Sequence, residues 1–246
     1  AHIEYRRREM GKKFLIGILL AGLLVIPSTA AAGWSPLQVA VWHPAQLVPD
    51  DWDVYGLRMN LLYGKNKNVW GFDLGVANTT EEKVRGIQAG LINGPGDLGG
   101  ISLGGINSTR RVNGCQAGVF SVAEDRINGV QLSALFNHSP VVRGLQLHAG
   151  VFGNFSEDVA GAQIAAGLTV NQAEIVRGAQ LSVIANNVNQ SMKGFQFSFY
   201  NFAKIMGGFQ LGIVNYAEEM KGLQVGLLNV VKDSPIPFLP IFQVGL

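Results

Sequence analysis

Along most of the chain, apolar residues alternate with polar or small residues in short stretches that recur at a nearly constant spacing. Four clear copies are "GIQAGLIN" at 86–93, "GFQFSFYN" at 194–201, "GFQLGIVN" at 208–215 and "KGLQVGLLN" at 221–229. In each copy a glutamine stands between two apolar residues, a small residue follows, and an asparagine comes further on. Alternation with a period of two predicts a β-strand with one apolar face and one polar or small face.

The whole chain from residue 37 onward can be aligned on the glutamine of this pattern, which we call the Gln column. The alignment gives 14 copies, mostly 14 to 17 residues apart, with spacings of 20 and 19 at the two ends. Connections such as "NYAEEMKG" contain most of the charge and absorb the differences in length, which is typical of turns. The column positions are Gln38, Arg58, Asp73, Gln88, Ser102, Gln116, Gln131, Gln146, Gln163, Gln180, Gln196, Gln210, Gln224 and Gln243.

This pattern predicts an all-β repeat protein of about 14 strand-turn units of 14–17 residues, and two architectures fit it. The favoured one is a parallel β-solenoid, in which each unit is one coil stacked about 4.8 Å from the next. Its apolar columns would lie inside, an Asn column at a corner, and the Gln column along one face as a ladder of stacked amides. The expected ladder comprises Gln88, Gln116, Gln131, Gln146, Gln163, Gln180, Gln196, Gln210, Gln224 and Gln243.

The alternative is an antiparallel outer-membrane β-barrel of 14 strands, with apolar residues toward lipid and the Gln column toward water. A barrel has a period of two strands and alternates short turns with longer loops, whereas here one strand repeats with nearly uniform connections. The apolar stretch per unit is about 16 Å long, which is short of the roughly 25 Å of a lipid-facing band. Pro237 and Pro240 also suit a terminal cap better than a closing strand paired on both sides.

The N-terminal part of the chain has the features of a targeting segment. Met10, Lys12 and Lys13 precede the apolar run 14–26, and "PSTAAA" follows it. This order of basic, apolar and small residues predicts a secretory signal peptide over 10–32. Residues 1–9 are interpreted as a non-native leader, and residues 33–246 as a single β-repeat domain. We therefore expect an exported protein.

Composition and motifs give no indication of a reaction. The formal net charge of +2 does not indicate a nucleic-acid-binding surface, and Cys115 is the only cysteine, so no intramolecular disulfide is expected. No histidine pair has metal-ligand spacing, and His148 occupies the small-residue position of its repeat. The recurrent acidic turns lack the spacing of a calcium loop. We expect no catalytic, cofactor-binding or metal-binding residue.

Two charged residues stand in the Gln column itself. Arg58 and Asp73 replace glutamine in adjacent copies. Adjacent strands place equivalent positions side by side, so these two residues are predicted to form a cross-strand ion pair.

The string "GLQVGLLN", its degenerate copies and the ending "PIPFLPIFQVGL" resemble the bacterial surface repeat-containing proteins of spirochaete and Bacteroidetes type. The resemblance covers Leu37 to Leu246 and implies a location in the cell envelope, in the outer membrane or on the cell surface. With it, we expect a non-enzymatic protein with a structural or interaction role, which presents a regular Gln/Gly/Ser face to an unidentified envelope partner. The alternative function is that of a passive outer-membrane pore, and membrane association stays open.

Overall fold

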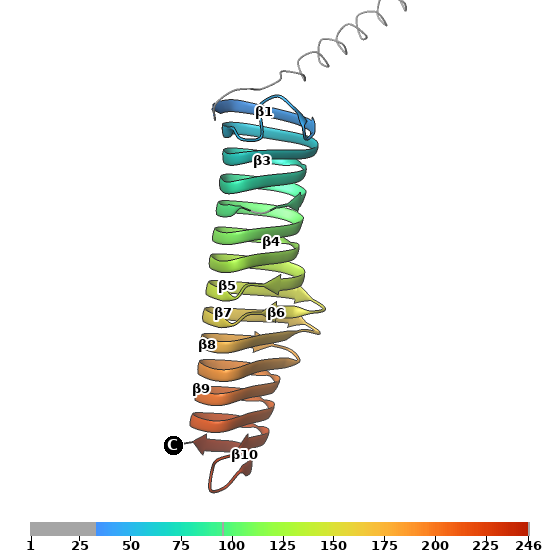
Figure 1. The fold of residues 1–246 in the computed structure, drawn as a ribbon. Helices are drawn as coiled ribbons and strands as arrows, with labels where there is room; N and C mark the ends of the chain where they lie inside the picture. The colour runs from blue at the N-terminus through green and yellow to red at the C-terminus, as the bar shows by residue number, and fades with distance from the viewer. Residues whose placement is uncertain (1–32, 95, 246) are drawn as a thin grey trace, which may run out of the picture.

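The computed structural model describes residues 33–94 and 96–245, which form a single column of stacked coils (Figure 1). Within these residues there are ten strands and no helix, and therefore no helix that could cross a membrane. The segments 1–9 and 10–32, interpreted above as leader and signal peptide, lie outside the described residues. The strands are β1 Trp34–Trp42, β2 Ala45–Gln46, β3 Asp53–Asn93, β4 Asp97–His138, β5 Val141–Gly150, β6 Gly153–Phe155, β7 Asp158–Gly167, β8 Val170–Ser182, β9 Ala185–Val231 and β10 Phe238–Gly245.

The coils pair in parallel, which confirms the predicted β-solenoid and not the antiparallel alternative. Strands β1, β3, β4, β5, β7, β8 and β9 follow one another through parallel pairing. Equivalent residues of the repeat are in register, so that the column runs through successive coils from Gln131 to Gln146, Gln163, Gln180 and Gln196. The longest elements, such as β9, continue around corners without a break and contain more than one repeat.

The last repeat unit is a cap. Strand β10 pairs antiparallel with β9, and Gln243 lies opposite Gln224. The register shifts between Leu239 and Ile241, so Pro240 lies at an irregularity of the ladder, where a missing N–H is tolerated. At the other end of the solenoid β2 pairs antiparallel with β1.

The structure reverses the predicted inner and outer faces. Gln224 is fully buried, whereas Leu227 is 68% exposed and the flanking Leu223 and Val225 are half-buried. The same holds along the column, where Gln and its substitutes point into the coil. The prediction that apolar columns flanking Gln form the core, and that a Gln/Gly/Ser face is presented to a partner, is therefore wrong.

The narrow interior of the coil explains this orientation. The small residue two positions after Gln shares the inward direction of Gln, because strand side chains alternate. At Gly212 a Cβ would lie 2.6 Å from Asn201 Nδ2, so there is no space for a larger residue. A shift of one residue would direct Leu211 and Ile213 into this space, and it would also leave the amides without their interior partners. The large apolar residues consequently lie outside.

The apolar core is formed by a different column, four residues before each Gln. These Val, Leu, Ile and Met side chains are buried and line the other half of the interior. Alanines such as Ala203 and Ala217 extend this cluster. The interior is therefore divided lengthwise into an amide half and an apolar half. The column comprises Val54, Val69, Val84, Leu98, Val112, Ile127, Val142, Val159, Val176, Met192, Met206 and Met220.

Candidate functional site

The Gln column forms a hydrogen-bonded ladder inside the solenoid. Gln146 Nε2 donates to Gln131 Oε1 at 2.9 Å, and Gln163 Nε2 donates to Gln146 Oε1 at 2.8 Å. The pattern continues through Gln180, Gln196, Gln210 and Gln224 with distances of 2.7 to 2.9 Å. Each amide thus accepts from the following coil and donates to the preceding one. A buried polar group costs little when it is hydrogen-bonded in this way.

The ladder is weaker or interrupted toward both ends. The Gln131–Gln116 contact is longer, at 3.5 Å. Gln88 donates to Asp73 Oδ2 at 2.8 Å and not to another glutamine. Gln243 lies in the column by its pairing, but its Nε2 donates to the Ile236 carbonyl at 2.7 Å.

A second ladder of asparagines occupies a corner of the coil. Asn215 Nδ2 donates to Asn229 Oδ1 and to the Val225 carbonyl, both at 2.9 Å. Asn201 makes the equivalent bonds to Asn215 and to the Leu211 carbonyl. Each of these asparagines therefore joins two consecutive coils and satisfies a backbone carbonyl of the next one.

The structure brings Arg58 and Asp73 together. Arg58 Nε donates to Asp73 Oδ1 at 2.6 Å and Arg58 Nη2 donates to Asp73 Oδ2 at 2.7 Å, and both side chains are fully buried. Arg58 also donates to the Thr79 carbonyl at 2.9 Å, while Gln88 donates to Asp73. The pair is closed off from solvent, so it supports the fold and is not placed to bind a ligand.

The surroundings of His148 and Cys115 also indicate a role in the fold. His148 Nδ1 lies 3.0 Å from Ser133 Oγ, and both residues are buried in the coil. Burial lowers the pKa of His148 below its ordinary value, which favours the neutral imidazole. Cys115 is half-buried beside Gln116, and burial raises the pKa of its thiol, which keeps it protonated. Among the described residues, no three His, Cys, Asp or Glu side chains are grouped to hold a metal ion.

The largest accessible feature is an apolar face on the outside of the solenoid. We define the apolar face as the residues one before, one after and three after each Gln-column position. Phe72 is 54% exposed, Leu91 63%, Phe199 59% and Leu227 68%. At about 4.8 Å per coil the face is about 60 Å long, and it is roughly 16 Å wide. This roughly 900 Å² exceeds the few hundred Å² of a typical monomer surface patch.

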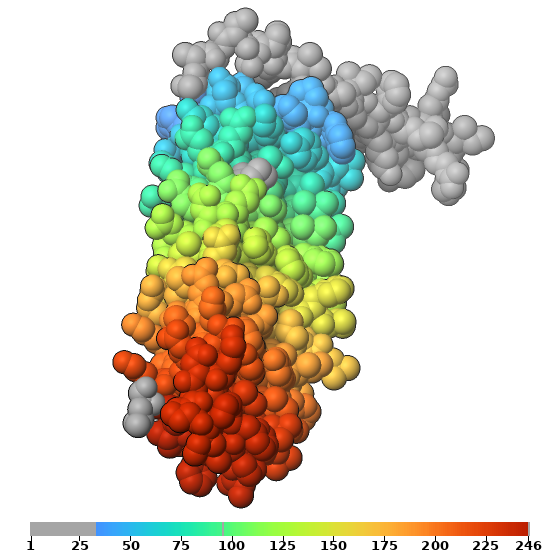
Figure 2. Space-filling view, turned by 60° about the horizontal axis from the view of Figure 1, so that its bottom comes forward, coloured from blue at the N-terminus to red at the C-terminus, as the bar shows by residue number. Residues whose placement is uncertain are grey.

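The apolar face is free of exposed charge. From one residue before to four residues after each column position, the described residues include only two charged side chains, the buried Arg58 and Asp73. The space-filling view shows an elongated body in which successive coils form successive colour bands (Figure 2). Because equivalent residues are in register, the apolar side chains of one coil lie beside those of the next. Sequence reasoning identified these residues but placed them in the core.

A row of basic residues lies along one border of the apolar face. The row occupies the position three residues before each Gln-column residue, which directly precedes the recurrent glycine. Every charged side chain at this position is positive and exposed. We call this row the basic edge. It comprises Arg85, Arg143, Arg177, Lys193 and Lys221.

Acidic residues lie off the apolar face, beyond the basic edge. Apart from buried Asp73, no Asp or Glu of the described residues stands between three residues before and four residues after a column position. Asp158 accepts from Arg143 and Arg177, each at 2.9 Å, and the hydrogen bond from Arg143 holds the pKa of Asp158 below its ordinary value. The basic edge therefore separates an uncharged apolar face from a mixed-charge surface.

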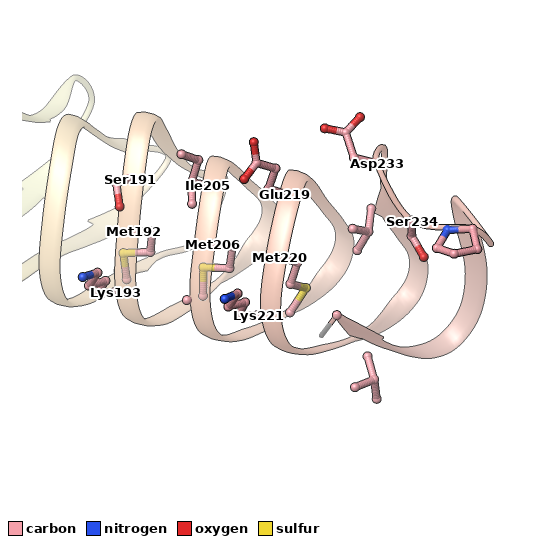
Figure 3. Close-up of a pocket in the computed structure, with 15 residues that line it drawn as sticks. Ser191, Met192, Lys193, Ile205, Met206, Glu219, Met220, Lys221, Asp233 and Ser234 are labelled. Carbon is pink, nitrogen blue, oxygen red and sulfur yellow. The ribbon is translucent and has the colours of Figure 1, made fainter.

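A cavity of about 530 Å³ lies at the C-terminal end of the basic edge. Met192, Met206 and Met220 line it, with Lys193 and Lys221 on one side (Figure 3). Glu219 and Asp233 also line this cavity, on the other side (Figure 3). Gly207 stands at the lysine position of the intermediate coil, which leaves space between the two lysines. This cavity belongs to the same border as the basic edge.

The glutamine, asparagine and Arg58–Asp73 groups thus stabilise the interior, and the accessible candidate site is the apolar face with its basic edge. Comparisons of this chain with protein-family models, with curated proteins and with solved structures found no match.

Proposed function

We propose that this protein is an exported, non-enzymatic component of the cell envelope or cell surface that acts by binding another envelope component through its apolar face. The observation that carries the proposal is the continuous exposed apolar face. Exposing so many Leu, Ile, Val and Phe side chains to water is unfavourable by about 25 cal/mol per Å². A partner that covers this face would recover that free energy.

Two sequence features support the proposed location. The predicted signal peptide over 10–32 supports export, and the resemblance of the repeat to bacterial surface repeat-containing proteins supports an envelope location. The surface proposed for binding differs from that expected from sequence, because the Gln side chains are buried. A solenoid suits this role, since stacked repeats build a long and regular surface.

The alternative function as a passive pore has no support from the geometry. It required antiparallel pairing of successive units and a Gln column facing a water-filled lumen. The coils are parallel, and the Gln amides bond to one another in a filled interior.

Cell fractionation tests the proposal. We expect the tagged full chain, expressed in a bacterial host, to be recovered in the envelope fraction, and a variant without residues 10–32 to stay in the cytoplasm. Phe199→Glu and Leu227→Glu place a charge on the apolar face and should reduce envelope recovery. Leu168→Glu is the control, because Leu168 is 75% exposed in the turn between β7 and β8, outside the apolar face and away from the cavity at the basic edge.

Recovery of the intact chain in the cytoplasm or in the medium would contradict the proposal. Equal envelope recovery of all three Glu variants would contradict the role of the apolar face.

A further inference from the structure

We propose that the partner of the apolar face is a phospholipid bilayer surface that contains anionic lipids. This inference rests on the proposed function and names its partner. The apolar face would enter the boundary between headgroups and acyl chains, and the basic edge would contact the phosphates.

The strand backbone permits such contact with the acyl chains. Backbone N–H and C=O groups that face lipid must find partners within the protein. On the apolar face each coil pairs with its two neighbours, as β7 pairs with β5 and with β8. The face therefore offers lipid only side chains such as Phe197, Phe199 and Leu227. Amphipathic helices of peripheral proteins insert their apolar faces about 5 to 10 Å deep, and the same depth is expected for this face.

The border of the apolar face matches the charge of anionic headgroups. The basic edge contains Arg and Lys, whose alkyl stems can lie along apolar surface while the charge reaches the phosphate layer. Near an anionic membrane each such residue contributes about 1 kcal/mol. No exposed carboxylate stands on the apolar face in the described residues, so nothing on that face repels an anionic surface. Beside the basic edge, Asp158 accepts from Arg143 and Arg177, so part of the positive charge of that edge is already paired.

Aromatic residues take the place of the basic ones toward the N-terminal end. Tyr55 and Trp70 stand at the same repeat position as the basic edge, and their ring centroids are 4.2 Å apart. Trp34 contacts Tyr55 edge-on at 6.2 Å and is 66% exposed. Trp and Tyr are enriched where protein meets the headgroup region of a membrane. The same border therefore presents aromatic and then basic residues along the solenoid.

A second copy of the chain fits this surface less well. Two apolar faces packed together would offer the basic edge no carboxylate from within either face, because no exposed acidic residue of the described residues stands on the apolar face. If the two solenoids ran antiparallel, basic edge would face basic edge. Anionic lipid supplies the counter-charge that a second copy lacks.

Vesicle flotation with the purified full chain tests the inference. We expect the chain to float with vesicles of equimolar phosphatidylcholine and phosphatidylglycerol, and to float less with phosphatidylcholine alone. Phe199→Glu and Leu227→Glu should lower the bound fraction on both vesicle types, whereas Leu168→Glu should not. Lys193→Gln combined with Lys221→Gln should weaken binding to the anionic vesicles by about fivefold per lysine. Lys204→Gln combined with Lys232→Gln is the charge-matched control away from the basic edge. Circular dichroism would verify that every variant keeps its β-structure.

Three outcomes would overturn the inference. One is no binding to either vesicle type while the wild-type chain is still recovered with the envelope in cells, which leaves the proposed function standing with another partner. The second is a dimer by light scattering that Phe199→Glu dissociates, without vesicle binding, which assigns the face to a second copy. The third is equal loss of binding in the two lysine pairs, which removes the role of the basic edge. Failure of envelope recovery itself would instead contradict the proposed function.

Discussion

Arg58 and Asp73 form a fully buried bidentate ion pair at two adjacent positions of a column otherwise built mainly from glutamine amides. The carboxylate of Asp73 receives a further hydrogen bond from Gln88, so the ladder continues beyond the pair. The pair therefore keeps the hydrogen-bond pattern of the column while it introduces two opposite charges. A buried charge is tolerated only when it is paired and hydrogen-bonded.

Removing one charge of this pair should destabilise the protein strongly. Asp73→Asn leaves the Arg58 guanidinium buried without its counter-ion, which costs about 3 to 5 kcal/mol. The double variant Arg58→Gln with Asp73→Gln restores two amides at column positions, so it should be more stable than Asp73→Asn. Urea unfolding followed by circular dichroism measures all three. A double variant less stable than the single one would contradict the view that the pair substitutes for two amides.

Removing one amide from the ladder should affect both neighbouring coils. Gln180 donates to Gln163 at 2.8 Å and accepts from Gln196 at 2.9 Å. Gln180→Ala leaves these partners incompletely bonded and opens a cavity, so a loss of about 2 to 5 kcal/mol is expected. Thermal unfolding measures the effect. The matched control is Gln190→Ala, because Gln190 is exposed and its removal should change stability by less than about 0.5 kcal/mol.

The sequence predicts the repeat unit, the parallel stacking and the register, but not which side of the strand faces inward. Register follows from matching equivalent positions, as Gln146 and Gln163 show. Alternation distinguishes the two faces of the strand but does not show which one is buried. Because burial of apolar residues is normally favourable, the pattern predicts that Leu223 and Val225 lie in the core. The decisive factor is the space inside the coil, which at Gly212 leaves no place for a Cβ beside the asparagine ladder. That space depends on where the chain turns, which the local pattern does not specify.

The sequence pattern does not predict the exposed apolar face, because it does not specify which side of the strand faces inward. Its residues were visible in the sequence, as was the basic row at Arg85, Arg143 and Arg177. One feature of the sequence indicates which face is exposed. The Gln position and the small residue two positions later point to the same side of the strand, so both belong to the inner face. Large apolar side chains such as Phe197 and Phe199 do not fit an interior in which most coils have Gly, Ala or Ser at the neighbouring inward position, with only Asn60 and His148 larger among the described residues.

The glycine at the corner of each coil should be sensitive to substitution. Gly208 has a φ of 138°, a conformation that L-residues rarely adopt, and an added Cβ would collide with the Gly194 backbone. Gly208→Ala should therefore cost at least about 1 to 3 kcal/mol in backbone strain alone. Gly207→Ala is an adjacent control, because the nearest atom to an added Cβ there is 3.6 Å away. Chemical unfolding of both variants checks the prediction, and equal losses would contradict it.

Mild acid should destabilise the solenoid partly through His148. Burial lowers the pKa of His148 below its ordinary value of 6.5, so the unfolded chain binds this proton more readily than the native protein. The contribution is absent above about pH 7, where both states are neutral, and stability falls as the pH drops below about 6.5. Ser133 and Ala165, which are in register with His148, are not titratable and cannot compensate its charge.

In His148→Ser the decrease in melting temperature between about pH 7 and pH 5 should therefore be smaller than in the wild type. An unchanged pH dependence in His148→Ser would show that protonation of His148 does not limit the stability of the coil.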